Sequence, residues 1–295
     1  MAILFWVAAA GAAEPDAGPF GLLKDPTGSE IQVFIENDSL GGTDRYYTNG
    51  IKIGGGIPAG RVSGLFTRPP NALLDAISDG ASNHFGLFIG QNLYTPRDVT
   101  IAAPQPNDRP WAAWLYVGAV AQSVKDDRLH TVEFDLGFVG PPALGKPVQT
   151  FWHDYIVDAP EPQGWGNQLR GEPGLLLTYL HKRRYGEHSG VQLVPHIGAT
   201  FGTIMTFARI GGIVRVYVVP NISITGELSG IKIPDSVSDK YKAHYADLDV
   251  YGTLNINRYV GIRAGYRSFD LGYLVEQDTG SFVLDGVYFG VIARY

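Results

Sequence analysis

Apolar and polar residues alternate along most of this chain with a period of two. In the segment 245–256, Ala246, Leu248 and Val250 share one face of an extended chain, while Asp247 and Asp249 share the other. Successive side chains of a β-strand point to opposite sides, so this pattern predicts a strand with one apolar and one polar face.

Clusters of Gly, Pro, Asn and Asp separate the alternating segments and predict turns between them. About a dozen strands are expected, and little of the chain favours helix. The expected strands span 30–38, 47–57, 84–93, 111–123, 129–139, 174–183, 189–199, 208–219, 222–230, 245–256, 259–271 and 283–295.

The last hairpin but one has charges on its polar face that can neutralise each other. Arg263 and Arg267 share the polar face of 259–271. If an odd number of residues connects the paired positions, Asp247 can pair with Arg267, and Asp249 with Arg263. The apolar face would be the core of a soluble sandwich or the lipid-facing side of an outer-membrane barrel, and alternation alone fits both.

Composition and the chain end favour the barrel. Charged residues make up only 18% of the chain and aromatics 12%, with 38 Gly and 16 Tyr, which suits strands, tight turns and aromatic girdles. No apolar run approaches the roughly 18 residues of a membrane-spanning helix, so any membrane span must be a strand. The final segment alternates up to the aromatic Tyr295, as terminal strands of outer-membrane barrels do, although a frayed terminus is the alternative.

These features predict an all-β fold, a transmembrane antiparallel up-and-down β-barrel of about 12 strands. Residues 1–13 end in small residues before Glu14 and predict a signal peptide, although its positively charged start is missing and a buried strand is the alternative. A Gly/Pro-rich leader (14–29) and a single barrel domain (30–295) follow. The proline-rich, aromatic stretch around 141–173 predicts an ordered non-strand excursion that packs on the barrel.

Several functions are excluded by what the sequence lacks. It contains no cysteine, and so has neither disulfides nor thiolate zinc sites. A net charge of −6 argues against duplex nucleic-acid binding. The nucleophile elbow G-x-S-x-G, the zinc helix H-E-x-x-H and the Walker phosphate loop are all missing.

Two segments carry candidate chemistry. The sequence END at 36–38, followed by TDRYYTNG at 43–50, concentrates carboxylate, hydroxyl and amide oxygens, which are ligands for hard cations. Extrapolated alternation puts Asp38 and Thr48 on the lumen side, although a polar hairpin loop is the alternative. His153 stands among aromatics with Asp154 and Asp158 nearby, and is either a general base or a structural histidine.

Five ordered motifs resemble the LpxR-type lipid A 3′-O-deacylase family. They are ENDSLGGTDRYYTNG, GQNLYTPRDVT, DRPWAAWLY, HDYIVDAPEPQGWGNQLRGEP and PHIGATFGT, and the resemblance runs from about Ile31 to Arg215. It implies a twelve-stranded outer-membrane barrel of a Gram-negative bacterium that hydrolyses the ester holding an acyloxyacyl chain on lipid A, in a calcium-dependent reaction. No motif of this family follows Arg215. From about Tyr217 onward the chain resembles outer-membrane barrels only in general.

The resemblance also implies roles for individual residues. Asn37 and Asp38 match the family's Asn-Asp pair, Thr48 its hydroxyl residue and His153 its base. His153 would take a proton from water, and Asp38 would help to hold Ca²⁺. Weaker candidates that support the site are Gln91, Tyr94, Asp108 and Arg109. The uncharged run after the YTP motif, which contains Ile101, lacks the lysine that family members can carry there.

Lipid A of lipopolysaccharide is thus the expected substrate, with outer-membrane lipids as surroundings and no nucleic-acid partner. We expect a monomer. Two alternative functions remain compatible with the sequence. One is a non-catalytic outer-membrane barrel, either a pore or a structural protein, and the other is a calcium-dependent outer-membrane phospholipase.

Overall fold

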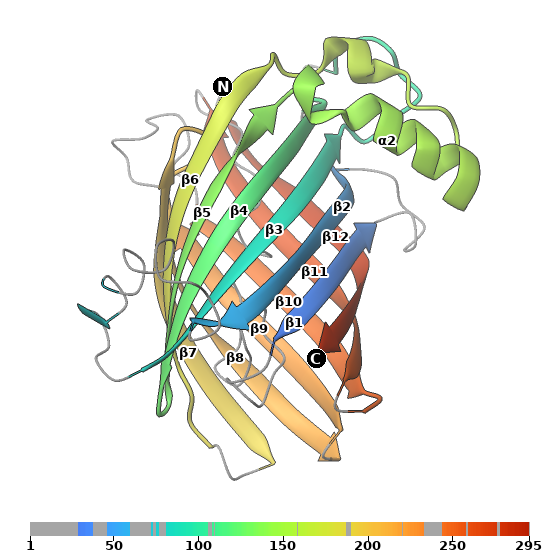
Figure 1. Ribbon diagram of the computed structural model, residues 1–295. Helices are drawn as coiled ribbons and strands as arrows, with labels where there is room; N and C mark the ends of the chain where they lie inside the picture. Colours follow the sequence, from blue (N-terminus) through green and yellow to red (C-terminus); the bar gives the residue numbers. More distant parts are fainter. Residues whose placement is uncertain are drawn as a thin grey trace.

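The architecture is that of a closed antiparallel barrel in a computed structural model of the chain (Figure 1). The structure describes residues 29–37, 46–59, 72, 75–76, 81–105, 108, 110–157, 159–186, 190–219, 221–232, 244–257, 259–275 and 278–294. The expected signal peptide and most of the leader lie outside these residues, as does Asp38.

Twelve strands close the barrel within the described residues, each paired with its sequence neighbours, and β1 pairs with β12. The predicted fold class and strand number are therefore confirmed. The strands are β1 (Glu30–Asn37), β2 (Tyr46–Pro58), β3 (Ser82–Thr95), β4 (Ala112–Lys125), β5 (Arg128–Val139), β6 (Glu172–Arg183), β7 (Val191–Gly202), β8 (Phe207–Val219), β9 (Ile222–Lys232), β10 (His244–Asn255), β11 (Val260–Val275) and β12 (Asp278–Arg294).

The excursion between β5 and β6 contains four short helices among its described residues. They are η3 (Pro141–Ala143), α2 (Gly145–Trp152), η4 (His153–Val157) and η5 (Gly164–Asn167). They lie at one end of the barrel, where β1, β3 and β5 end and β2, β4 and β6 begin (Figure 1). Among the described residues, no helix is both long and apolar enough to span a membrane.

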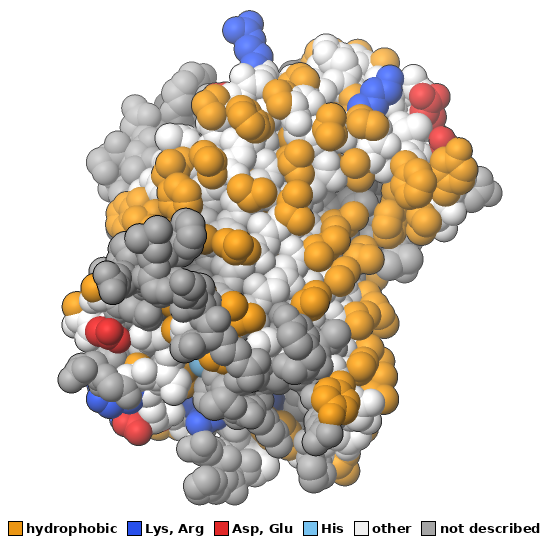
Figure 2. All heavy atoms as spheres, in the orientation of Figure 1, with side chains coloured by type: hydrophobic (Ala, Val, Ile, Leu, Met, Phe, Trp, Pro, Cys, Tyr) orange, Lys and Arg blue, Asp and Glu red, His pale blue; other side chains and the backbone are white. Residues whose placement is uncertain are grey.

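Side chains alternate between the lumen and the outer surface, as the sequence predicts. On β5, Glu133 and Asp135 are buried in the lumen, while Phe134, Leu136 and Phe138 are exposed on the outside. Figure 2 shows such hydrophobic side chains spread over the outer wall, with few charges among them. In water, this much exposed apolar surface would be costly, whereas hydrocarbon solvates it.

The lumen holds the polar face, and charged side chains form ion pairs within it. Lys52 of β2 lies 3.6 Å from a carboxylate oxygen of Glu133 on β5, and its ammonium also stands over the ring of Phe88. These contacts reach across β3 and β4, because the strand order places both strands between β2 and β5. Their pairing offsets part of the cost of burying these two charges.

The predicted pairing of β10 with β11 is partly observed. Arg267 donates two hydrogen bonds to Asp247, at 2.8 and 2.6 Å, which confirms the first predicted pair. The two residues are diagonal neighbours, because the register places Arg267 opposite Asp249. Asp249 accepts a hydrogen bond from Tyr288 of β12 at 2.9 Å, and the guanidinium of Arg263 stands over the ring of Tyr251.

Candidate active site

The segment that carries His153 begins with a sharp change of direction. Gly140 has φ of 79°, and a Cβ there would lie 2.5 Å from the carbonyl oxygen of Leu169, so a side chain does not fit. Two prolines follow at the start of η3, where their missing N–H groups cost nothing. Leu144, with φ of 58°, then ends η3 and starts α2.

A small hydrophobic core fixes this segment on the ends of β3 and β4. The rings of Trp111 and Trp165 meet edge to face, with centroids 5.0 Å apart. The indole N–H of Trp165 donates to Gln149 of α2 at 2.7 Å, so the buried ring has a partner for its polar atom. The cluster consists of Leu93, Val99, Trp111, Ala113, Ala143 and Trp165. The sequence prediction that the excursion packs on the barrel is confirmed.

Hydrogen bonds tie the same segment to the strand ends. Gln91 of β3 donates its side-chain amide to the carbonyl of Ala143 at 2.6 Å. Leu169 N–H donates to the carbonyl of Trp111 at 2.9 Å. The side chain of Asn167 reaches the carbonyl of Ala102, 2.7 Å away, in the connection between β3 and β4. Packing and hydrogen bonds together hold η4 at the rim.

His153 is the first residue of η4 and is 1% exposed. Its Nδ1 lies 2.6 Å from the carbonyl oxygen of Pro160. A carbonyl can only accept, so Nδ1 carries the proton, and in the neutral ring Nε2 holds the lone pair. Pro160 has no sequence signal for this role, because every residue offers the same backbone carbonyl.

Asn37 and Thr48 belong to the neighbouring strand ends at the same rim. The backbone of Asn37 pairs with Asn49, which places the end of β1 beside the start of β2. The β2–β3 register shifts between Tyr47 and Asn49, so a bulge falls at Thr48. A bulge interrupts simple alternation, and the lumen side expected for Thr48 stays a prediction. Asp38 follows directly but lies outside the described residues.

The weaker candidates have structural contacts where they are described. Gln91 holds Ala143, as above, and Tyr94 is buried at the end of β3. Asp108 accepts the backbone N–H of Arg97 at 2.8 Å. Arg109 lies outside the described residues. These contacts agree with a scaffolding role.

Another carboxylate of this rim, Asp98 in the YTPRDVT motif, is held by local hydrogen bonds. The Thr100 hydroxyl donates to Asp98 at 2.6 Å and the Thr100 backbone N–H at 2.9 Å. The side-chain and then the backbone hydrogen bond from Thr100 lower the pKa of Asp98 below its ordinary value. The Asp98 carboxylate thus stabilises the turn that contains it.

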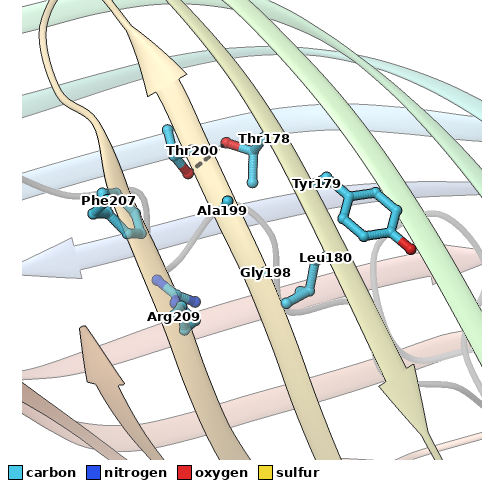
Figure 3. A pocket seen from close by; sticks show the side chains of 8 residues that line it. All are labelled: Thr178, Tyr179, Leu180, Gly198, Ala199, Thr200, Phe207 and Arg209. Atoms are coloured by element: carbon cyan, nitrogen blue, oxygen red, sulfur yellow. Dashed lines mark hydrogen bonds between the residues drawn. The ribbon is translucent and has the colours of Figure 1, made fainter. Parts of the chain in front are cut away.

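A small pocket lies elsewhere, among β6, β7 and β8 (Figure 3). The hydroxyls of Thr178 and Thr200 lie 2.9 Å apart on its wall, with Arg209 and Phe207 nearby. None of the residues that line it comes from β1, β2 or η4, so it is separate from the predicted site. Among the residues that the structure describes, no three His, Asp or Glu side chains gather in a way that suits a metal ion.

The outward apolar belt, the charged lumen and the closed twelve-strand barrel define an outer-membrane β-barrel. The sequence matches the model of the family described as outer membrane protein LpxR over residues 1–217, and the chain therefore belongs to this family. This confirms the resemblance seen in the motifs and identifies the chain as an outer-membrane protein. Family membership also supports activity as a lipid A deacylase.

Solved structures with a similar fold include LpxR from Salmonella typhimurium, with a TM-score of 0.64 at 15% identity. That comparison covers 90% of this chain and 99% of the other. The β domain of the Bordetella autotransporter BrkA has a TM-score of 0.50 at 12% identity, covering 91% of this chain and 98% of the other. At such identities the likeness concerns the fold. Among curated proteins, none matches this sequence.

Proposed function

We propose that this protein is an outer-membrane lipid A 3′-O-deacylase that hydrolyses the ester of the 3′-acyloxyacyl chain in a calcium-dependent reaction. Membership in the LpxR family supports the substrate class. The observation that carries the proposed chemistry is the hydrogen bond from His153 Nδ1 to the Pro160 carbonyl. It sets the tautomer that a general base needs.

His153 acts in this proposal through its Nε2 atom. Nε2 takes a proton from a water molecule, and the water oxygen attacks the carbonyl carbon of the ester. The bond between that carbon and the sugar oxygen then breaks, and the imidazolium returns the proton to the leaving oxygen. Water supplies the nucleophile, so no serine is required. The products are a fatty acid and a sugar hydroxyl.

The donor set near the β1–β2 rim fits a hard cation by its chemistry. Asp38 would hold the calcium ion, and Asn37 and Thr48 offer the amide and hydroxyl oxygens that such ions accept. When bound, the ion would stabilise negative charge on the ester oxygen. Asn37 could contribute to the same stabilisation through its amide, and Thr48 could orient water or substrate.

The position of His153 along the barrel suits a lipid substrate of the outer leaflet. Outer-membrane barrels have short periplasmic turns and longer external loops. The end that carries His153 has the connections 96–111, 140–171 and 233–243, and the opposite end has the short connections 126–127, 220–221 and 256–259 beside one long one, 59–81. The site would then lie at the outer surface, where lipid A resides.

Fatty-acid release from purified lipid A, with the protein in detergent, tests the proposal. Added Ca²⁺ is expected to support release of the 3′ acyloxyacyl chain, and EDTA to abolish it. A parallel incubation with glycerophospholipid should release nothing. Calcium-independent release would reject the role of the metal, and release only from the phospholipid would make the protein a phospholipase.

A further inference from the structure

The segment that carries His153 exposes four large apolar side chains. Phe151, Tyr155 and Ile156 are 55%, 74% and 54% exposed, and Leu144 at the start of α2 is 52% exposed. The rings of Phe151 and Tyr155 lie against each other, with centroids 5.1 Å apart. We call these four residues the outer face of the segment.

Other side chains of the same segment are buried and pack against the barrel. Gln149 and His153 are buried toward the strand ends, and Val148 packs against the core of Trp111 and Trp165. The outer face is therefore not needed for the docking described above. Within the described chain, it remains an exposed group of four large apolar side chains beside the site.

The outer face continues the lipid-facing wall of the barrel. α2 packs against β3 and β4, whose outward residues Leu87, Ile89 and Val117 are themselves 72%, 49% and 55% exposed. In Figure 1, α2 extends beyond the outline of the barrel at this end, and Figure 2 shows hydrophobic side chains running from the wall onto that region. A membrane that covers the wall would thus reach the segment.

We propose that the outer face contacts the acyl chains of outer-leaflet lipid and anchors the His153 segment at the depth of the lipid A ester bonds. Apolar side chains on an amphipathic segment gain free energy when they insert at the boundary between headgroups and acyl chains. Lys146 and Asp154 on the same segment are exposed and would remain at the polar headgroups. The catalytic purpose of this contact rests on the proposed function, whereas the contact itself does not.

The depth of the outer face in a bilayer tests this directly. The chain contains no cysteine, so single cysteines introduced by Tyr155→Cys and Ile156→Cys can each carry one nitroxide label. Leu87→Cys on the outer wall serves as the lipid-exposed reference, and Glu161→Cys, at an exposed position of the same excursion, serves as the aqueous reference. The barrels are reconstituted in vesicles that contain lipopolysaccharide, and collision rates with oxygen and with a water-soluble nickel chelate are measured.

Labels at 155 and 156 should collide with oxygen and avoid nickel, as the label at 87 does. A nickel accessibility like that at 161 would overturn the proposal. Spectral broadening that disappears on dilution with unlabelled protein would also overturn it, because a second copy would then cover the face.

Activity provides a second readout. The double variant Phe151→Ser, Tyr155→Ser should raise the KM for lipid A in bilayers by roughly tenfold or more, because two aromatic anchors are lost. Its kcat on lipid A dispersed in detergent should be unchanged, and equal losses in bilayer and detergent would contradict anchoring. If the protein proves inactive while labels 155 and 156 lie in lipid, the proposed function fails and the lipid contact stands.

Discussion

At the scale of single residues, His153 combines burial with a fixed ring orientation. A substitution that keeps the size but removes the base should separate catalysis from packing. His153→Gln should lower kcat by about 100-fold or more, the usual contribution of a general base, and leave the folded barrel intact.

The neighbouring variant Asp154→Asn is the matched control, because Asp154 is exposed and has no role in the proposed chemistry. It should keep activity near that of the unmodified protein. Steady-state rates of fatty-acid release measure both variants. Undiminished turnover by His153→Gln would remove His153 from the mechanism.

Gly211 of β8 shows how one missing side chain organises the lumen. His196 of β7 reaches over it to Ser229 of β9, 2.9 Å away, and lies 3.6 Å from Glu227. A Cβ at position 211 would lie 2.4 Å from the Leu228 carbonyl and 2.6 Å from His196 Nε2.

Gly211→Ala should therefore destabilise the barrel by about 1–3 kcal/mol, the usual cost of overpacking. Gly226→Ala on β9 is the control, because a Cβ there meets no atom within 4 Å. Denaturant midpoints of the two refolded variants provide the comparison. Equal midpoints would show that the His196 contact adjusts freely.

At the scale of elements, the excursion between β5 and β6 depends on Trp165. Trp165→Ala removes a ring that packs on Trp111 and donates to Gln149, so it should cost about 3–5 kcal/mol of local stability. Limited proteolysis in detergent should then cut within 140–171 and leave the barrel whole. Phe151→Ala, at an exposed aromatic of the same segment, should not increase cleavage. Cleavage of the strands in Trp165→Ala would contradict a local role.

Much of the element level was predictable from the sequence, because period-two alternation fixes which side chains share a face of a strand. The expected pair Asp247 and Arg267 follows from this alternation together with the parity of the connection between β10 and β11. The positions of the candidate site residues at the rim were less predictable from the sequence. The bulge at Thr48 breaks the alternation, and the Pro160 carbonyl that orients His153 is a backbone atom without sequence signature. The roles of Asn37, Asp38 and Thr48 remain predictions from the family resemblance.

For the molecule as a whole, the side chains inside the lumen help to decide whether the barrel could act as a pore. Lys52 and Glu133 meet across β3 and β4, and Tyr288 of β12 reaches Asp249 of β10. These contacts place paired side chains inside the lumen and favour a barrel that is narrowed within.

The protein should therefore give no stable single-channel currents in planar bilayers. Lys52→Ala, Glu133→Ala should remain closed or show only brief openings, because the other lumen contacts persist. Steady conductance by the unmodified protein would favour a pore over an enzyme.

His153 is proposed to act as the general base of an outer-membrane enzyme that removes an acyloxyacyl chain from lipid A. The most direct measurement is the mass of lipid A after outer membranes are incubated with this protein and calcium. A loss of mass equal to the 3′ acyloxyacyl chain is expected with the unmodified protein and not with His153→Gln. Lipid A of unchanged mass in both samples, with the protein folded in the membrane, would show that the protein is not a lipid A deacylase.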